Sequence, residues 1–429
     1  MFMKDPYRYA SLLLMSALLL ASCNPFKPVA IPDAAGQIPE TYTLYTGVGD
    51  TSTPWWPALD APELDRLIQE AISGNFTLKV AWARLRQAGS IAAQVGADRV
   101  PDLEASGAAE VARRRSELTP GGSVGDDTYA VGLFSSYEVD LWGRVASQWK
   151  AAVLDVEASQ ADLQTAMVTV AAEVADRWVR IIAQRLQRQL LEKQLANNET
   201  FLELIELRFR KAMVSALDVY QQRQTVESVR ARIPLADAEL QLLIHELAVL
   251  LGRLPRSDLG LSRMDIPDIG QLPPVGLPVD LLASRPDVQA AGMRLRSAQW
   301  QVAAARANRL PALRLTAGAQ YGSSELDLLF DTWLLSLAAN LTAPIFDGGR
   351  RVAEVDRTRA RVDENLWIYR QAVVSAIKEV EDAMVSETRQ REHIQGLEAV
   401  KEASSRGLEE AIERYRRGLS DYLPVLTQL

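Results

Sequence analysis

The chain has 429 residues, of which 48% are hydrophobic and 24% are charged, a composition typical of a folded protein rather than a disordered one. Its formal net charge of −8 argues against a broad nucleic-acid-binding face. Because the chain has one cysteine and two histidines, we expect no internal disulfide, no cysteine-based zinc site and no cofactor.

Residues 1–22 have the pattern of a secretory signal peptide, since a short basic region precedes an apolar run over residues 10–20. The run ends in Leu20-Ala21-Ser22-Cys23, which resembles the bacterial lipobox, so we predict cleavage before Cys23 and acylation of this residue. Asn24 follows, rather than the aspartate that usually retains lipoproteins in the inner membrane, and this points to the outer membrane. Acyl chains embed in lipid at about 0.8 kcal/mol per buried methylene, so such an anchor needs no membrane helix. The alternative is a plain signal peptide with a chance cysteine.

The mature sequence contains an internal duplication. Arg84-Leu85-Arg86 recurs as Arg294-Leu295-Arg296, and the run from Arg208 to Met213 recurs from Arg414 to Leu419. Several matches in the same order predict two structural repeats. We therefore expect an extended segment over 23–61, a first repeat over 62–252, a linker over 253–276 and a second repeat over 277–429.

Each repeat is predicted to contain the same elements in the same order. A helical stretch comes first, over about 62–98 and 277–308, and a proline ends it (Pro101 or Pro311). A strand hairpin follows, over 101–141 and 311–345. A very long helix then runs over about 144–211 and 351–417, and in the first repeat a return helix continues to about residue 251.

The hairpins are predicted from segments in which apolar and polar residues alternate, which is the period of a β-strand. Each segment has about ten residues, the length of a tilted transmembrane strand, although a soluble hairpin with one wet face would also fit. No apolar run after Cys23 is long enough for a membrane helix, so a membrane crossing would need these strands. Four strands cannot close a barrel, and open edges are too costly in lipid, so we predict a homo-oligomer. Aromatic residues on or beside the strands could form an interfacial girdle or simply pack: Tyr129, Tyr137, Trp142, Tyr321 and Trp333.

The long helices have the apolar spacing of coiled coils. Between Arg144 and Lys211 there is neither glycine nor proline, and such a helix would be roughly 100 Å long at 1.5 Å per residue. Apolar residues step by four and three in both repeats: Leu163, Met167, Val170 and Val174, then Val373, Ile377, Val380 and Met384. Paired helices in a long bundle or tube fit this pattern better than a helix packed on a globular core. A glycine at each strand-to-helix junction permits a sharp turn, and Asp347 is placed to cap the helix that follows it.

The ordered set of motifs resembles the outer-membrane factors of the TolC type, in particular the NodT-like efflux lipoproteins. The resemblance covers nearly the whole mature chain and is carried by these runs: Trp55-Trp56, Asp60-Ala61-Pro62-Glu63-Leu64, Asn75-Phe76-Thr77-Leu78, Asp140-Leu141-Trp142-Gly143-Arg144, Ser284-Arg285-Pro286-Asp287-Val288, Pro344-Ile345-Phe346-Asp347-Gly348-Gly349-Arg350 and Arg414-Tyr415-Arg416-Arg417-Gly418-Leu419-Ser420.

This resemblance implies an α+β membrane protein and a homotrimer. Four strands per chain would contribute to a 12-stranded outer-membrane β-barrel, continued by a periplasmic α-helical barrel. It also implies a passive efflux duct for small molecules that docks to a periplasmic adaptor and an inner-membrane transporter, by family habit of the resistance-nodulation-division type. The aperture and adaptor-docking tip would consist of Ala212, Met213, Val214, Ser215, Gly418, Leu419, Ser420 and Asp421. Three copies of Asp421 could form a ring of acids that responds to cations or pH.

One departure from the family pattern concerns the second repeat, which stops soon after its tip where the family has a returning helix. We expect a truncated return helix there, because a tube without it would expose apolar seams. A protein-secretion duct of the same architecture remains an alternative, as does, less favoured, a periplasmic adaptor lipoprotein. We expect no enzyme activity, since the sequence contains no phosphate loop, metal-ligand cluster or nucleophile motif.

Overall fold

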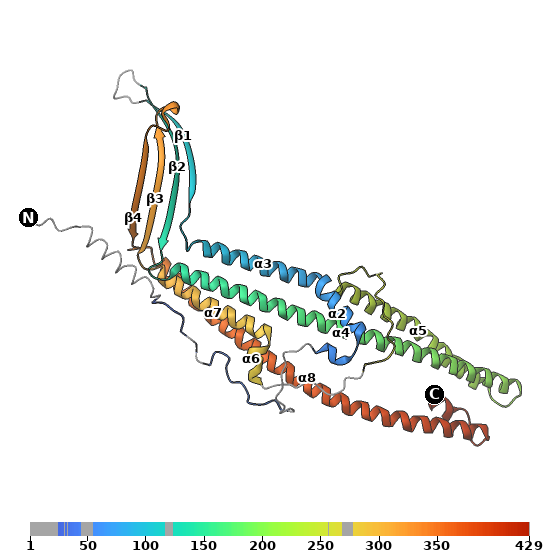
Figure 1. The fold of residues 1–429 in the computed structure, drawn as a ribbon. Coiled ribbons are helices and arrows are strands. Elements are labelled where there is room, and N and C mark those ends of the chain that lie inside the picture. Colours follow the sequence, from blue (N-terminus) through green and yellow to red (C-terminus); the bar gives the residue numbers. More distant parts are fainter. Residues whose placement is uncertain are drawn as a thin grey trace, which may run out of the picture. The chain divides into compact units, whose positions relative to one another are not determined.

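A computed structural model describes residues 25–29, 31, 33–43, 55–115, 123–255, 257–267 and 278–428. The fold divides into two compact units (Figure 1). Unit 1 comprises Met1–Gln37, Ala83–Asp162 and Pro286–Val373, and unit 2 comprises Ile38–Trp82, Leu163–Arg285 and Val374–Leu429. The predicted signal peptide and Cys23 lie outside the described residues.

Unit 1 contains an antiparallel sheet with the strand order β1-β2-β3-β4. Its strands are β1 (Glu104–Arg115), β2 (Ser123–Val139), β3 (Ala312–Ser323) and β4 (Trp333–Thr342), which confirms the four predicted segments. The register pairs odd-numbered residues with odd-numbered residues at each strand pair: Ala105 with Leu133, Leu133 with Ala319, and Ala319 with Leu335. Side chains alternate along a strand and directly paired residues share a face, so the apolar sets of all four strands lie on one face.

The helices of unit 1 begin where polar side chains satisfy the first backbone N–H groups. Helix α4 (Arg144–Arg210) starts after Gly143, whose φ is 72°, and the Asp140 carboxylate accepts hydrogen bonds from the backbone N–H groups of Val145 and Ala146 at 3.1 and 2.8 Å. Helix α8 (Arg350–Arg416) starts in the same way, because Asp347 accepts from the N–H groups of Gly349 and Arg351. The predicted capping role of Asp347 is confirmed.

Unit 2 has a core formed mainly by α2 (Pro62–Gly74), α4 and α5 (Ala216–Leu250). Trp178 of α4 is fully buried in this core, and its indole N–H donates to Glu63 Oε1 at 2.7 Å. The other Glu63 oxygen accepts from the backbone N–H and the hydroxyl of Ser262 and from the N–H of Arg263, which fixes the segment after α5. Burial opposes ionisation of Glu63, but these hydrogen bonds outweigh it and hold its pKa below the ordinary value.

Two of the predicted helical stretches are each broken in the structure. The stretch 62–98 is divided at Asn75 into α2 and α3 (Phe76–Ala97), and the amide of Asn75 both caps the Leu78 N–H and donates to the Leu250 carbonyl at 2.8 Å. A Cβ on Gly74 would lie 2.4 Å from the Leu251 carbonyl oxygen. The helix therefore breaks at a point where two chain segments approach each other closely. The stretch 277–308 is divided before Pro286 into a short 3-10 turn and α6 (Leu281–Ser284), followed by α7 (Pro286–Ala307). Pro286 occupies the first position of α7, where its missing N–H costs nothing.

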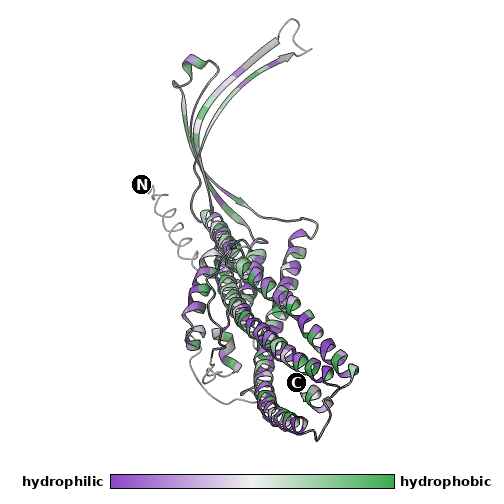
Figure 2. Ribbon diagram, turned by 90° about the vertical axis from the view of Figure 1, so that its right-hand side faces the viewer, coloured by the Kyte–Doolittle hydropathy of each residue, from purple (hydrophilic) through white to green (hydrophobic). Residues whose placement is uncertain are grey.

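Apolar and polar residues are interleaved along the helices and strands rather than gathered in one continuous apolar helix (Figure 2). Within the described ranges, no helix has both the length and the hydropathy that a membrane span requires.

Candidate functional site

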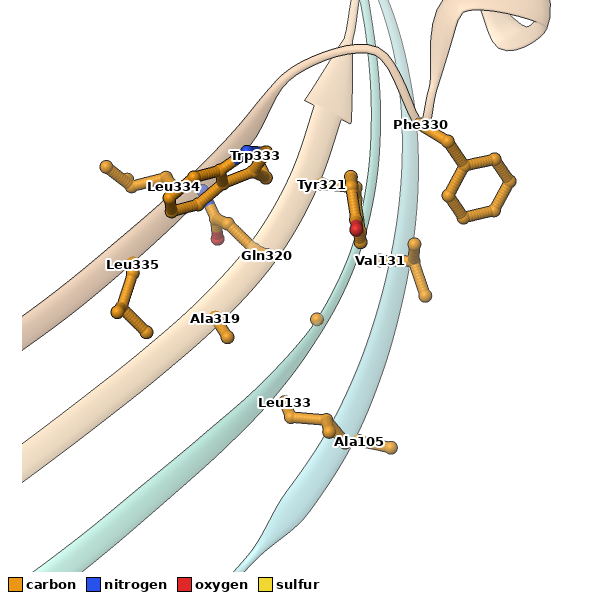
Figure 3. A pocket seen from close by; sticks show the side chains of 11 residues that line it. Ala105, Val131, Leu133, Ala319, Gln320, Tyr321, Phe330, Trp333, Leu334 and Leu335 are labelled. Carbon is orange, nitrogen blue, oxygen red and sulfur yellow. The ribbon is translucent and has the colours of Figure 1, made fainter.

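The apolar face of the sheet is exposed in the isolated chain. Leu335 and Leu341 of β4 are both 68% exposed and Leu337 is 83% exposed. Side chains from all four strands line a hollow on the sheet with a volume of about 430 Å³ (Figure 3). They include Ala105, Leu133, Tyr321 and Trp333. An exposed apolar surface of this extent marks contact with lipid or with another protein rather than with water.

The opposite face carries polar and small side chains. Glu138 of β2 forms an ion pair with Arg144 at 2.8 Å, and Arg314 of β3 approaches the same carboxylate to 3.8 Å. The other even-numbered positions on this face hold mostly glycine, alanine, serine, threonine or amide side chains, as at Thr316 and Asn340. The strands are ten to seventeen residues long, and their sheet has one polar face and one apolar face. This arrangement matches a wall between lipid and a water-filled lumen.

Both outer strands of this sheet have an unpaired edge. Within the described sheet, β1 pairs only with β2 and β4 pairs only with β3. Each edge therefore offers a row of N–H and C=O groups for pairing with another strand.

The helix tip of unit 2 is formed by two turns of the same design. In the first turn the Ala212 N–H donates to the Phe209 carbonyl and the Met213 N–H donates to the Arg208 carbonyl, both at 2.9 Å. In the second, Gly418 and Leu419 donate to the Tyr415 and Arg414 carbonyls at 3.1 and 2.9 Å. These are the paired bonds of a Schellman motif, and the left-handed residue is Ala212 (φ 55°) in one turn and Gly418 (φ 72°) in the other.

The predicted tip residues lie on or beside these two turns. Ala212, Met213, Ser215, Gly418, Leu419 and Asp421 are exposed, and Val214 and Ser420 are half-buried. Ser215 begins α5 with a capping box, in which its hydroxyl accepts from the Asp218 N–H and the Asp218 carboxylate accepts from the Ser215 N–H at 2.8 Å. Asp421 corresponds to Ser215 in the repeat and lies two residues before the start of α9 (Leu423–Gln428).

A single apolar cluster brings the two turns together. Ile205 of α4, Val219 of α5, Ala411 and Tyr415 of α8, and Tyr422 and Val425 at the second turn are all buried in it. The guanidinium of Arg208 lies 4.2 Å from the centre of the Tyr415 ring. The structure therefore places both predicted halves of the tip in one packed unit.

Sequence reasoning missed a buried polar network at this tip. The Tyr422 hydroxyl donates to Gln222 Oε1 at 2.9 Å, and the Gln222 amide donates to the backbone and side-chain oxygens of Asn198 at 2.8 and 3.1 Å. All three residues are buried. Burial, followed by the nearby Tyr415, raises the pKa of the Tyr422 hydroxyl, which therefore stays a neutral donor. The sequence carried no signal for it, because Gln222 is an ordinary helix residue and Tyr422 lies 200 positions away, just before α9.

The described residues contain no group of three or more histidine, cysteine, aspartate or glutamate side chains that could hold a metal ion. The candidate functional surfaces are the two faces and edges of the sheet and the helix tip.

The fold and these surfaces define a class of membrane channel, and comparison with known proteins identifies the family. The family model of the outer membrane efflux proteins matches residues 67–253 and 277–428. The chain belongs to this family and is an outer membrane efflux protein.

Individual relatives agree with this assignment. The chain is 33% identical to the pyoverdine export outer membrane protein OpmQ of Pseudomonas aeruginosa, over 87% of the chain and 80% of the relative. Its structure is similar to that of the outer-membrane channel OprN, with a TM-score of 0.83, 28% identity and coverage of 95% of this chain and 91% of that one. The open state of the MtrE outer membrane channel of Neisseria gonorrhoeae matches with a TM-score of 0.82, 26% identity and the same coverages.

Proposed function

We propose that three copies of this chain form a passive duct that carries small molecules across the outer membrane. The observation that supports this most is the sheet: four strands with an exposed apolar face, a polar face and two unpaired edges. Unpaired backbone groups cost several kcal/mol each in lipid, so the edges need partner strands. If β4 of one copy pairs with β1 of the next, three copies give twelve strands and a closed wall. The polar face would then line the lumen.

The helix tip is the proposed docking end for a periplasmic adaptor, which would link the duct to an inner-membrane transporter. Met213, Leu217 and Leu419 are each more than 60% exposed at or beside the two turns, and such apolar side chains on a well-packed support suit a protein contact. Basic residues directly precede both turns in the sequence: Arg208, Arg210, Lys211, Arg414, Arg416 and Arg417. We expect docking to weaken at high salt, since exposed charges are screened.

Lipidation of Cys23 is proposed to hold the mature chain in the outer membrane, as the lipobox-like run Leu20-Ala21-Ser22-Cys23 suggests. Mass spectrometry of the mature N-terminal peptide tests this. We expect a peptide that starts at Cys23 and carries acyl chains, whereas an unmodified Cys23 would refute it.

Planar-bilayer recording of the detergent-purified protein tests the duct. We expect discrete openings, with the oligomeric mass measured on the same sample equal to three chains. A detergent-independent monomer without conductance would contradict the proposed duct.

A further inference from the structure

One aromatic side chain interrupts the polar face of the sheet. Phe134 lies at an even-numbered position of β2, and among the strand residues whose side chains the structure describes it is the only aromatic on that face. The side chain is 38% exposed. Its neighbours on the face are small or polar, as at Ser136 and Thr316, so the ring does not belong to an apolar core.

Two glycines allow the ring of Phe134 to lie along the sheet. Gly318 pairs directly with Phe134 across β2 and β3, and Gly132 precedes Phe134 by two residues on the same face. A Cβ on Gly318 would lie 3.1 Å from Cδ1 of the ring, and a Cβ on Gly132 would lie 3.0 Å from Cε2. The ring therefore lies close to both glycines, which Gln320 and Ser336 also approach. A ring held against the backbone keeps its outer side open to a molecule that moves past the face.

An acidic residue lies directly opposite Phe134 on the neighbouring strand. Glu104 of β1 pairs directly with Phe134 and is exposed. Directly opposed residues in antiparallel strands have Cβ atoms about 4.5–5.5 Å apart, so both groups can touch one small molecule. An aromatic ring offers stacking to a planar aromatic group, and the carboxylate attracts a positive charge.

We infer that Phe134 and Glu104 together form a weak binding contact for planar aromatic cations in the lumen. This inference rests on the proposed duct, because it requires the polar face to line the lumen. The contact acts on cargo that passes, as side chains in a pore wall do when they set selectivity. Phe134 supplies preference for a flat ring and Glu104 supplies preference for the charge.

Current block in single trimers tests the contact with two cations. Proflavine is planar and aromatic, whereas tetrabutylammonium carries the same charge without a ring. We expect Phe134→Leu to raise the dissociation constant of proflavine by about two- to tenfold and that of tetrabutylammonium by clearly less, because leucine keeps the apolar volume but removes the face on which a flat ring stacks. Phe134→Trp should retain the block by proflavine. Glu104→Gln should weaken both cations.

Thr316→Ala, one pair further along the same face, is the matched control and should change neither constant. The inference is overturned if Phe134→Leu leaves proflavine block unchanged or weakens both cations equally. If the unmodified protein conducts but proflavine does not block it, the binding contact is wrong and the proposed duct still stands. If the unmodified protein forms no channel, the proposed duct itself is wrong.

Discussion

Helices α4 and α8 occupy the same place in the two repeats and have the same length of 67 residues, yet their surroundings differ. Val174, Trp178 and Ile182 of α4 are buried in the unit 2 core, mainly against α2 and α5. In α8 the residues 389–406 are exposed on every face, and the described residues contain no helix that covers them as α5 covers α4. Ile394, Leu397 and Val400 are each about half exposed there.

The two repeats therefore give helices of the same length, whereas the burial of each helix depends on the elements packed against it. The positions of α8 that correspond to Trp178, Ile181 and Ile182 of α4 hold Met384, Glu387 and Thr388. At these three sites the first repeat has large apolar residues, and the second repeat has a smaller or polar residue at each. Four experiments test how far this contrast extends.

The largest effect should follow from Trp178→Ala. The change removes a fully buried indole and leaves Glu63 Oε1 without the indole N–H, so the surrounding amides of α4 should lose roughly 3–5 kcal/mol of protection against opening. Hydrogen exchange measured by mass spectrometry reports this locally. Met384→Ala at the matching site of α8 is the control and should cost clearly less. Equal losses at both sites would remove the contrast between the helices.

A smaller effect is expected from Gln222→Leu at the tip. This change leaves the Tyr422 hydroxyl without its acceptor and Asn198 without its donor, both in buried positions, which should cost about 1–3 kcal/mol in local opening. The exposed Gln224→Leu on the same helix should have little effect. If exchange at the second turn stayed unchanged in Gln222→Leu, the network would not join the two turns.

The contacts of Glu63 should make the segment after α5 sensitive to acid. The pKa of Glu63 in the folded chain lies below its ordinary value of 4.5, so its stabilising contribution is complete above that value and is lost as the pH falls through the lower, folded pKa. We expect exchange at Ser262 and Arg263, corrected for the intrinsic pH effect, to rise on the order of tenfold between neutral pH and about pH 3. Glu63→Gln should show the faster exchange already at neutral pH and little further change. A variant with the same pH profile as the unmodified chain would contradict this role.

The smallest effect concerns the left-handed residues of the two tip turns. Gly418→Ala should destabilise the second turn by about 1 kcal/mol, because an alanine side chain is strained at positive φ. A Cβ there would meet nothing within 4 Å, so strain in the backbone is the whole effect. Ala212→Gly should relieve the corresponding strain in the first turn, and protection of the two turns by hydrogen exchange measures both. If both substitutions lowered the protection of their turns, or both raised it, the two left-handed residues would not have equivalent roles.

The sequence predicted the strands and the long helices well, because alternation and coiled-coil spacing are local patterns. Alternation gave each of the four strands one apolar side, and the odd-to-odd register shows that these sides lie together on one face. The break at Asn75 was missed, since it depends on contacts of Gly74 and Asn75 with Leu250 and Leu251, far away in the chain.

The positions of the two tip turns were predicted, but their internal contacts were not. The repeated run that ends at Met213 and Leu419 located both tip turns, and the structure shows that their hydrogen bonds are the same. The network of Gln222 could not be predicted, because hydrogen bonds between distant helices leave no periodic pattern. Whether Asp421 forms a ring of acids depends on the copies around it and stays a prediction.

The pairing of β4 with β1 of a neighbouring copy is the most direct test of the whole account. Ala108 of β1 can be replaced by cysteine together with Ser336, Ala338 or Asn340 of β4, all on the polar face, so that one combination brings two thiols within the roughly 3.5–4.5 Å Cβ separation of a disulfide. After oxidation of the intact outer membrane, we predict that at least one pair gives a covalent product of three chains on a non-reducing gel, whereas each single cysteine gives two chains at most. Monomers alone from every pair, or a ladder that continues beyond three chains, would contradict a closed trimer.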